Sequence, residues 1–209
     1  MRLINGDCLE EMEKIKDNSV DLVITSPPYN VDLGNNKYRK TPYKLYNDNK
    51  EHSEYIKWLC VIFSMVYGKL KKGGRVCINI GDGKNGAIPT TSDVIQFMTK
   101  EIGFIPMTHI IWNKKQTSAR TAWGSWMSPS SPSFPTPFEH ILVFAKESIK
   151  LQYKGESDIT KEEFIEYSLA LWSFSGEKNQ KKIGHPAMFP EELAYRLIKM
   201  FSYKNALVL

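Results

Sequence analysis

Between residues 20 and 29 the chain reads Val20-Asp21-Leu22-Val23-Ile24-Thr25-Ser26-Pro27-Pro28-Tyr29. The apolar run predicts a buried strand, and the double proline ends it abruptly, because each proline lacks an N–H and fixes φ at about −65°. The turn therefore holds a hydroxyl, free carbonyls and an aromatic ring at the carboxyl end of a strand, where open α/β sheets bind ligands. This pattern favours a site in which a flat, amino-bearing ring stacks on Tyr29 and donates to Ser26 and Pro27. A plain proline-rich turn is the alternative interpretation.

The segments around this turn resemble those of a known enzyme family. Asn5-Gly6-Asp7-Cys8, followed by a strand and Ser-Pro-Pro-Tyr, resembles the S-adenosylmethionine-dependent DNA amino-methyltransferases, whose catalytic motif is [Asp/Asn/Ser]-Pro-Pro-[Tyr/Phe]. The serine form is more similar to the N4-cytosine branch than to the N6-adenine branch. Further matches follow in the family's order at residues 73–82, 110–114, 138–144 and 185–193. Because the catalytic motif comes first and the cofactor motif last, the order resembles the circularly permuted β class.

The resemblance implies a fold and a division of the chain. We expect an α/β fold: an incomplete Rossmann-like methyltransferase sheet with helices on both faces and a small target-recognition region. The expected parts are the catalytic half (1–112), a DNA-facing loop (113–137), a hairpin strand of the sheet (138–150), a candidate target-recognition insert (151–183), and the pre-cofactor helix with the start of the cofactor-binding strand (184–209).

The resemblance also implies catalytic and cofactor-binding residues. An acid that closes a strand, as Asp7 is expected to do, is also common in turns, and His185 taken alone would more often be a hydrogen-bonded structural residue. The catalytic set is Ser26, Pro27, Pro28 and Tyr29, and the set expected to bind S-adenosylmethionine is Asp7, Gly81, Asp82, His185, Pro186 and Phe189.

Basic residues interleaved with aromatic residues suit phosphate contact and base stacking, and they predict double-stranded DNA as a partner. Lysines and an arginine alternate with tyrosines soon after the catalytic motif, and basic residues recur before a stretch rich in Trp, Ser and Pro. For any single cluster, ordinary solvated lysines are the alternative. The expected DNA-binding set is Lys37, Arg39, Lys40, Lys44, Lys114, Lys115, Arg120, Trp123 and Trp126.

The composition narrows the class of protein. With 209 residues, the chain is long enough for one domain with a sizeable core. No stretch reaches the roughly 18 apolar residues that a membrane helix needs, so no membrane partner is expected. The three cysteines predict neither a disulfide framework nor a Cys-x-x-Cys metal pair, which indicates reduced thiols in a cytoplasmic protein. The four histidines are scattered and predict no metal site, while the net charge of +5 permits nucleic-acid binding.

One family motif is missing from the printed residues. The chain lacks Asp-Pro-Phe-x-Gly-x-Gly, the glycine-rich turn that holds the methionine end of the cofactor in the family. The strand expected between the Asp7 strand and the final strand is absent as well, and open strand edges template association. We therefore expect the missing part to be supplied by chain beyond residue 209, by a second subunit, or by a homodimer.

Together these features predict a site-specific DNA methyltransferase of restriction–modification type that methylates N4 of cytosine in a duplex. The target base must be flipped out, because a base inside the stack cannot reach the turn. Ser26 and Pro27 would then hold the amino hydrogens while Tyr29 stacks on the base, and methyl transfer would be an in-line displacement. The alternatives are N6-adenine methylation, a non-catalytic DNA-binding subunit or remnant, and methylation of an amide or amine on protein or RNA.

Hydrophobic spacing predicts the elements that carry these motifs. Strands are expected at 3–7, 20–25, 75–80, 104–112, 140–145 and 206–209. Helices are expected at 8–15, from Tyr55 through Lys71 and Lys72 to a stop at Gly73, at 91–102, at 160–172 after a Thr160–Glu163 capping box, and from Pro190 onward with an apolar stripe of Leu193, Leu197, Ile198 and Phe201.

Overall fold

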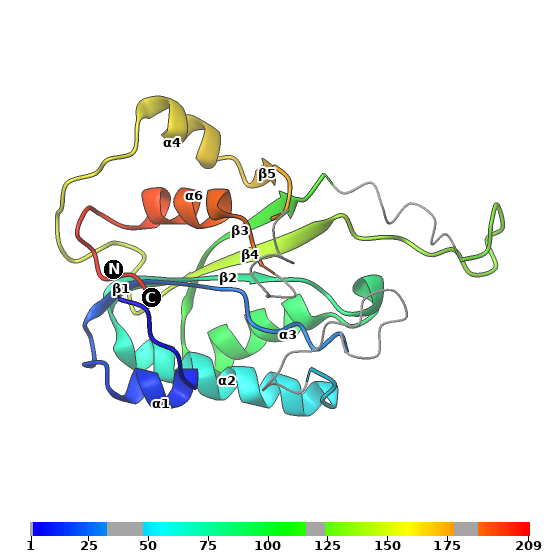
Figure 1. Cartoon of the computed structure of the whole chain (residues 1–209), viewed down its shortest axis with the longest axis horizontal. Coiled ribbons are helices and arrows are strands. Elements are labelled where there is room, and N and C mark those ends of the chain that lie inside the picture. Colours follow the sequence, from blue (N-terminus) through cyan, green and yellow to red (C-terminus); the bar gives the residue numbers. More distant parts are fainter. Residues whose placement is uncertain (1, 33–47, 116–123, 178–187) are drawn as a thin grey trace.

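The computed structural model of the chain describes residues 2–32, 48–115, 124–177 and 188–209. At its centre is a five-stranded sheet with the strand order β1-β2-β4-β3-β5 (Figure 1). β1 and β2 are parallel, β4 lies antiparallel between β2 and β3, and β5 runs parallel to β3. This sheet confirms the predicted α/β class. The strands are β1 (Val20–Thr25), β2 (Leu70–Ile80), β3 (Ile105–Asn113), β4 (Phe138–Ala145) and β5 (Leu171–Ser173).

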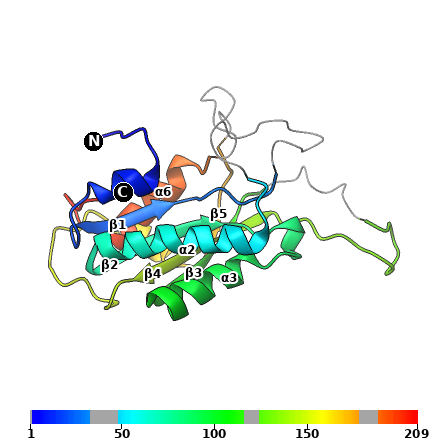
Figure 2. The ribbon, with the colours of Figure 1, turned by 90° about the horizontal axis from the view of Figure 1, so that it is seen from below.

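Helices cover both faces of the sheet, as expected. α2 and α3 lie against one face and α6 lies against the other (Figure 2). α3 continues directly into a π-helical turn, η2, which ends at Gly103 with φ of 91°, a conformation that glycine adopts freely. The helical elements are α1 (Cys8–Glu13), α2 (His52–Lys69), η1 (Lys84–Gly86), α3 (Thr90–Gln96), η2 (Phe97–Ile102), α4 (Lys161–Tyr167) and α6 (Glu191–Phe201).

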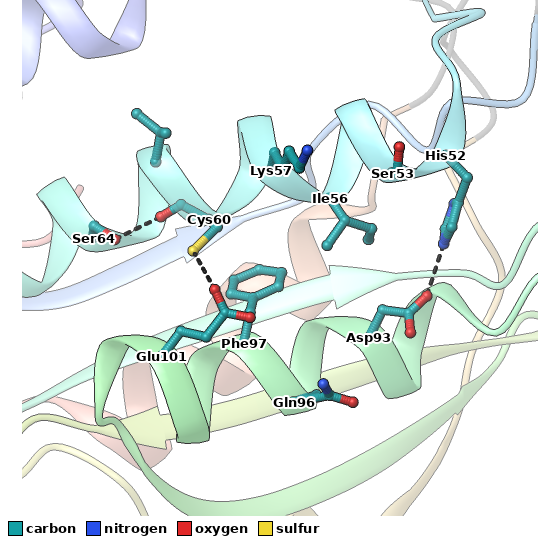
Figure 3. A pocket seen from close by; sticks show the side chains of 11 residues that line it. His52, Ser53, Ile56, Lys57, Cys60, Ser64, Asp93, Gln96, Phe97 and Glu101 are labelled. Atoms are coloured by element: carbon teal, nitrogen blue, oxygen red, sulfur yellow. Dashed lines mark hydrogen bonds and ion pairs between the residues drawn. The ribbon is translucent and has the colours of Figure 1, made fainter.

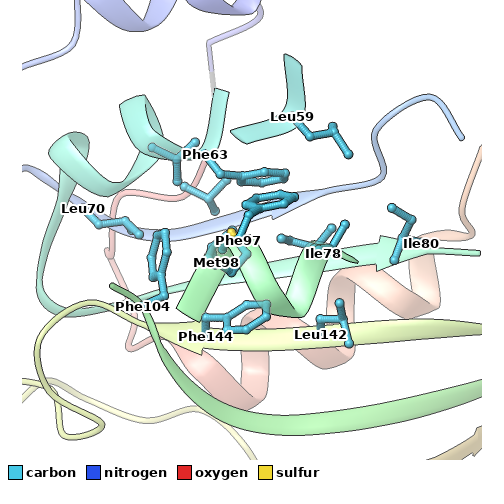
Figure 4. Close-up of a cluster of buried hydrophobic side chains, with 14 of the residues drawn as sticks. Leu59, Phe63, Leu70, Ile78, Ile80, Phe97, Met98, Phe104, Leu142 and Phe144 are labelled. Atoms are coloured by element: carbon cyan, nitrogen blue, oxygen red, sulfur yellow. The ribbon is translucent and has the colours of Figure 1, made fainter. Parts of the chain in front are cut away.

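The first hydrophobic core lies between the sheet and the helices α2, α3 and η2 (Figure 4). Phe63 of α2 stacks on Phe97 of η2 with ring centroids 6.2 Å apart, and Phe104 packs against Phe144 of β4 at the same separation. All four side chains are at most 3% exposed. This core fixes α2 against the sheet, and so it also sets the position of Tyr55 on that helix.

The second core lies between the opposite face of the sheet and α6. Leu193, Leu197 and Phe201 of α6 are buried there, as the predicted stripe requires. Ile198 is 41% exposed and does not belong to the stripe, so that part of the prediction is wrong. Its position turns away from the buried row because the three buried residues are spaced by four along the helix.

α2 ends earlier than the sequence pattern predicts. Its last residue is Lys69, and Leu70 already begins β2 because it pairs with β1 and its side chain is fully buried. The predicted last helical turn at Lys71–Lys72 and the helical stop at Gly73 are therefore wrong. Gly73 instead takes φ of 78° within β2, where an added Cβ would collide with the Lys150 carbonyl oxygen.

The strand predicted at residues 3–7 is also wrong. Leu3 is 87% exposed, and none of the described strands pairs with this segment. The edge of β1 is taken instead by residues 207–209. Asp7, the acid that was expected to close the strand, caps α1, and its carboxylate accepts a hydrogen bond from the Leu9 N–H at 2.8 Å.

The helix predicted at residues 160–172 stops at Tyr167, although its Thr160–Glu163 capping box is confirmed. The chain then turns back to form β5, because Trp172 is buried to 1% exposure and its indole N–H donates to the Tyr167 carbonyl at 3.1 Å. Pro190 precedes α6 as its N-cap and is not its first helical residue. The five-part division of the chain stays a prediction.

Residues 207–209 run along β1, so the strand predicted at 206–209 is confirmed as a short paired segment. The Leu209 N–H donates to the Leu22 carbonyl at 2.9 Å, and the Ile24 N–H donates to the Leu209 carbonyl at 2.8 Å. The Asp21 carboxylate, on a residue that is 3% exposed, accepts from the Leu207 N–H and pairs with Lys71, both at 2.8 Å. This carboxylate anchors the segment to the sheet.

Candidate active site

The predicted catalytic turn leaves the sheet at the end of β1. Ser26, Pro27, Pro28 and Tyr29 are each half-buried, so the turn is neither sealed inside the core nor fully exposed. The hydroxyl of Tyr55 on α2 donates to the Pro28 carbonyl at 2.7 Å. Because Tyr55 is fully buried, this bond ties the turn to the helix that packs on the sheet.

Asn30 fastens the part of the chain that follows the turn. Its side-chain nitrogen donates to the Lys50 carbonyl at 2.8 Å, and its side-chain oxygen accepts from the Lys50 N–H at 2.7 Å. The backbone of Asn30 has φ of 56°, a left-handed conformation in which asparagine is enriched. The Asp32 N–H donates to the Asp48 carbonyl at 3.1 Å. We call these bonds the Asn30 clamp, because they join residues 30–32 to residues 48–50.

Hydrogen bonds connect the turn with side chains from β2 and β4 and, through Glu139, with the residue that follows β3. Tyr29 Oη lies 3.0 Å from Ser26 Oγ and donates to Glu139 Oε2 at 2.9 Å. Asn79 of β2 donates through Nδ2 to Tyr29 Oη at 2.7 Å and to Glu139 Oε2 at 2.6 Å. Lys114, just after β3, pairs with Glu139 Oε1 at 2.7 Å. These five residues, the Glu139 network, meet at the edge of the sheet where β1, β2 and β3 end and β4 begins.

The network is shielded from water. The pKa of Tyr29 is raised well above its ordinary value, first by burial of its hydroxyl and then by the negative charge of Glu139, so Tyr29 keeps its proton at neutral pH. The side chains of Lys114 and Glu139 are only 17% and 15% exposed, so salt screens this pair less than a surface pair. Asn79 Oδ1 is buried and accepts no hydrogen bond from any described residue.

Gly81 and Asp82 follow β2 and lie beside the turn. A Cβ at Gly81 would stand 3.4 Å from the Tyr29 ring, so no side chain separates residue 81 from the turn. One Asp82 oxygen accepts from an N–H in the first turn of α3 at 2.7 Å, and the other lies 3.9 Å from His140 Nε2. His140 Nδ1 lies 2.8 Å from His109 Nε2. Burial lowers the pKa of both imidazoles, which favours their neutral forms at pH 7.

The structure places the other predicted residues in different surroundings. Asp7 is exposed and caps α1, and Phe189 is half-buried against the second core. Lys114 pairs with Glu139 in the network, whereas Lys115 is exposed. Trp126 is also exposed, at 64%. The remaining predicted residues, Lys37, Arg39, Lys40, Lys44, Arg120, Trp123, His185 and Pro186, lie outside the described residues.

Sequence reasoning missed Asn79, Glu139 and Tyr55. Asn79 interrupts the apolar run at the end of β2, residues 76–80, and Glu139 lies next to the first residue of β4, whose later residues are mostly apolar. A polar side chain in a buried strand needs a hydrogen-bonding partner, so both positions carried a usable signal. Tyr55 gave no such signal, because its ring fits the apolar stripe of α2 and only the fold shows what its hydroxyl contacts.

A separate pocket of about 720 Å³ lies between α2 and the α3–η2 helix (Figure 3). His52 pairs with Asp93 at one end of it, and Cys60 lies near Glu101 at the other. None of the predicted catalytic residues lines this pocket. Among the described residues, no group of three or more His, Cys, Asp or Glu is arranged to hold a metal ion, and no helix is long and apolar enough to span a membrane.

Comparison with known proteins agrees with this geometry. The profile of a family of N6 and N4 methyltransferases, described as DNA methylase, matches residues 20–209. The chain belongs to this DNA methylase family. A relative, the type II methyltransferase M.MjaVI of Methanocaldococcus jannaschii, is 42% identical over 181 residues, which are 86% of this chain and 88% of the relative.

Solved structures share the fold of this DNA methylase. A candidate DNA modification methylase from Thermus thermophilus, complexed with S-adenosyl-L-methionine, has a TM-score of 0.69 at 25% identity, and the match covers 97% of this chain and 75% of the Thermus chain. The cytosine-N4-specific PvuII DNA methyltransferase has a TM-score of 0.68 at 24% identity over 97% of this chain and 71% of its own, which shows a common fold. The predicted amino-methyltransferase family and Rossmann-like fold class are confirmed.

Proposed function

We propose that this DNA methylase is the catalytic and target-recognition part of a type II restriction–modification enzyme that uses S-adenosylmethionine to methylate N4 of cytosine in a specific duplex sequence. The observation that carries the proposal is the half-buried hydroxyl of Ser26, held against Tyr29 at the end of β1 and followed by two prolines. The serine at the first motif position supports cytosine over adenine, since it resembles the N4 branch of the family.

The turn acts on a base that has been flipped out of the duplex, at a cost of about a few kcal/mol. The exocyclic nitrogen is a poor nucleophile because its lone pair is delocalised into the ring. Ser26 Oγ and the Pro27 carbonyl accept its two N–H bonds, while Tyr29 stacks on the ring, so that the lone pair is oriented for attack. No described residue donates to the Pro27 carbonyl, whereas the Pro28 carbonyl is engaged by Tyr55.

The described residues fit one side of a site for S-adenosylmethionine, which supplies an electrophilic methyl group. Gly81 brings the backbone next to the Tyr29 ring with no side chain between them, and among the described residues one oxygen of Asp82 has no donor closer than His140 at 3.9 Å. Asp82 can therefore accept from hydroxyl or ammonium groups of the kind that this cofactor carries. The proposed cofactor set is completed by Asp7, His185, Pro186 and Phe189.

Double-stranded DNA is the proposed partner. Of the residues proposed to contact it, Lys115 and Trp126 lie within the described residues, and both are exposed. We assign Lys114 to the site, because its ammonium is held by Glu139. The proposal includes a complementing part that carries the glycine-rich cofactor turn, either a C-terminal fragment, a second subunit or a second copy. The outer edge of residues 207–209 supports this part, because no described backbone group pairs with the N–H and C=O of Val208. The enzyme would work in the cytoplasm.

Transfer of a tritiated methyl group to unmethylated bacteriophage DNA tests the proposal, with and without a complementing polypeptide that contains Asp-Pro-Phe-x-Gly-x-Gly. We expect label in DNA, N4-methylcytosine after digestion to nucleosides, and loss of label with Ser26→Ala. N6-methyladenine would retain the enzyme class and overturn the choice of base. DNA without label in both arrangements, or label in protein or RNA, would overturn the proposal.

A further inference from the structure

The carboxylate of Glu139 is the one charged acceptor within hydrogen-bonding reach of the Tyr29 hydroxyl among the described residues. It lies at the start of β4, 110 residues along the chain from Tyr29, and receives hydrogen bonds from three donors: Tyr29 in the turn after β1, Asn79 in β2 and Lys114 just after β3. Its side chain is 15% exposed, and a carboxylate so shielded is stable only when its oxygens are paired. Lys114 and Asn79 provide that pairing.

The count of protons fixes the direction of the hydrogen bonds. Tyr29 has one hydroxyl proton and two acceptors for it, Glu139 Oε2 at 2.9 Å and the Asn79 carbonyl at 3.2 Å. The ionised oxygen is both nearer and the stronger acceptor, so the proton points to Glu139. Tyr29 Oη can then only accept at the 3.0 Å contact with Ser26, and the Ser26 hydroxyl is the donor there.

Asn79 reinforces this direction. Its amide nitrogen has two protons, and the structure directs one to Tyr29 Oη and one to Glu139 Oε2. The opposite orientation of the amide would set its oxygen against the carboxylate. Asn79 Oδ1 points elsewhere and is left buried without a described partner, which shows that the two donated bonds outweigh one unsatisfied acceptor.

We propose that Glu139 is a positioning residue for methyl transfer, which acts through Tyr29 to keep the Ser26 oxygen an acceptor toward the target amino group and to draw a proton away from it. This inference rests on the proposed function. With its own proton committed to Tyr29, Ser26 Oγ presents only lone pairs to the base. A serine free to rotate would present its proton to the amino group for part of the time, and that arrangement cannot hold an N–H bond.

The same series of hydrogen bonds, from Ser26 through Tyr29 to Glu139, removes the excess proton after methyl transfer. Once methylated, the amino group bears a positive charge and one proton too many. An N–H proton passes to Ser26 Oγ, the Ser26 proton passes to Tyr29 Oη, and the Tyr29 proton passes to Glu139 Oε2. Ser26 and Tyr29 each end with one proton, as at the start, the amine becomes neutral, and the protonated Glu139 later returns its proton to water. Tyr29 remains a neutral phenol throughout, in keeping with its raised pKa.

Replacing Glu139 by glutamine tests the direction of the hydrogen bonds from Ser26 through Tyr29 to Glu139. In Glu139→Gln the amide oxygen must face the Lys114 ammonium, so the NH₂ group faces Tyr29. Tyr29 then loses its charged acceptor, its proton turns to Ser26 or to the Asn79 carbonyl, and no carboxylate remains to take up the excess proton. We expect kcat for tritiated methyl transfer to bacteriophage DNA to fall about 100-fold, with KM for DNA within about threefold of wild type. The matched control Glu147→Gln, at an exposed position just after β4, leaves kcat unchanged.

A double-variant cycle separates this role from a structural one. Tyr29→Phe keeps the ring and removes the link, so adding Glu139→Gln in that background lowers kcat by no more than about twofold. The inference is overturned if the fold losses in kcat of the two single variants multiply in the double variant, or if Glu139→Gln has the kcat of wild type. If Glu139→Gln folds poorly by circular dichroism, Tyr29→Phe alone decides, and an unchanged kcat overturns it. A wild-type chain that transfers no label, even with the complementing polypeptide, counts instead against the proposed function.

Discussion

Removal of the Tyr55 hydroxyl will show how firmly α2 holds the catalytic turn. In Tyr55→Phe the buried ring stays in the first core, and the 2.7 Å bond to the Pro28 carbonyl is lost. A buried acceptor left without its donor costs about 1–3 kcal/mol, and because Pro28 is half-buried we expect a cost of about 1.5 kcal/mol here. For a protein of this size, each kcal/mol lowers Tm by about 2–4 °C, so the expected drop is about 3–6 °C.

Thermal unfolding followed by circular dichroism measures this drop, and Tyr195→Phe is the matched control. The Tyr195 hydroxyl donates to Glu163 at 2.8 Å, but its residue is 42% exposed, so water replaces the lost bond and Tm changes by less than about 2 °C. Equal shifts in the two variants would mean that the bond to Pro28 is not a buried one, and the argument that α2 positions the turn would fail.

Three further perturbations test the backbone and the electrostatics. Gly73→Ala, at φ of 78° and against the Lys150 carbonyl, should cost about 2 kcal/mol or more in urea unfolding, whereas Gly68→Ala in α2, where an added Cβ meets nothing within 4 Å, should stabilise by about 0.5–1 kcal/mol. In Gly81→Ala the added methyl group makes an ordinary 3.4 Å contact with the Tyr29 ring, so Tm should hold while methyl transfer drops at least about tenfold because the ring shifts against the base. Equal losses of stability and of activity would refute a role for residue 81 beside the turn. Burial raises the pKa of Asp21, but hydrogen bonds from Lys71, Leu207 and Tyr153 outweigh burial, so the pKa in the folded protein lies below its ordinary value. The ionised carboxylate therefore stabilises the fold fully above the unfolded pKa of about 3.9, and this stabilisation is lost as the pH falls through the lower folded pKa. Asp21→Asn should be less stable than wild type at pH 7, and its stability should change less with pH below about pH 4 in acid unfolding.

The parts of the fold that could be predicted from sequence are those decided locally. β1 and the turn after it depend on a run of apolar residues and two prolines, and the α4 cap depends on two residues three positions apart. The end of α2 could not be predicted in this way. Leu70 continues the apolar stripe of the helix, and it becomes a strand residue only because β1 lies where Leu70 can pair and be buried. Trp172 likewise becomes a strand residue because β3 lies where Trp172 can pair with it and be buried.

In the candidate site, too, the residues that a local motif holds together could be predicted, whereas those brought together by the fold could not. Ser26 and Tyr29 were identified because a short motif holds them together. Their partners Asn79 and Glu139 come from strands that meet the motif only after the sheet has formed, with β4 between β2 and β3. A polar residue in an apolar strand indicates that a partner exists, but sequence spacing does not say which one. Lys114 illustrates this, because its charge predicts DNA contact but could not indicate that the folded chain pairs its ammonium with Glu139.

The Asn30 clamp fixes the positions of residues 30–32 relative to residues 48–50. Its two side-chain bonds to Lys50 close the segment between them as a backbone pair would, so the ends of that segment keep one geometry whatever its length. Lengthening a closed loop costs little, about 0.6 kcal/mol for each doubling. The Asn30 clamp therefore holds residues 30–32, which follow the Ser26 turn, to residues 48–50 whatever the number of residues between them, so a change in that number should leave the turn in its place.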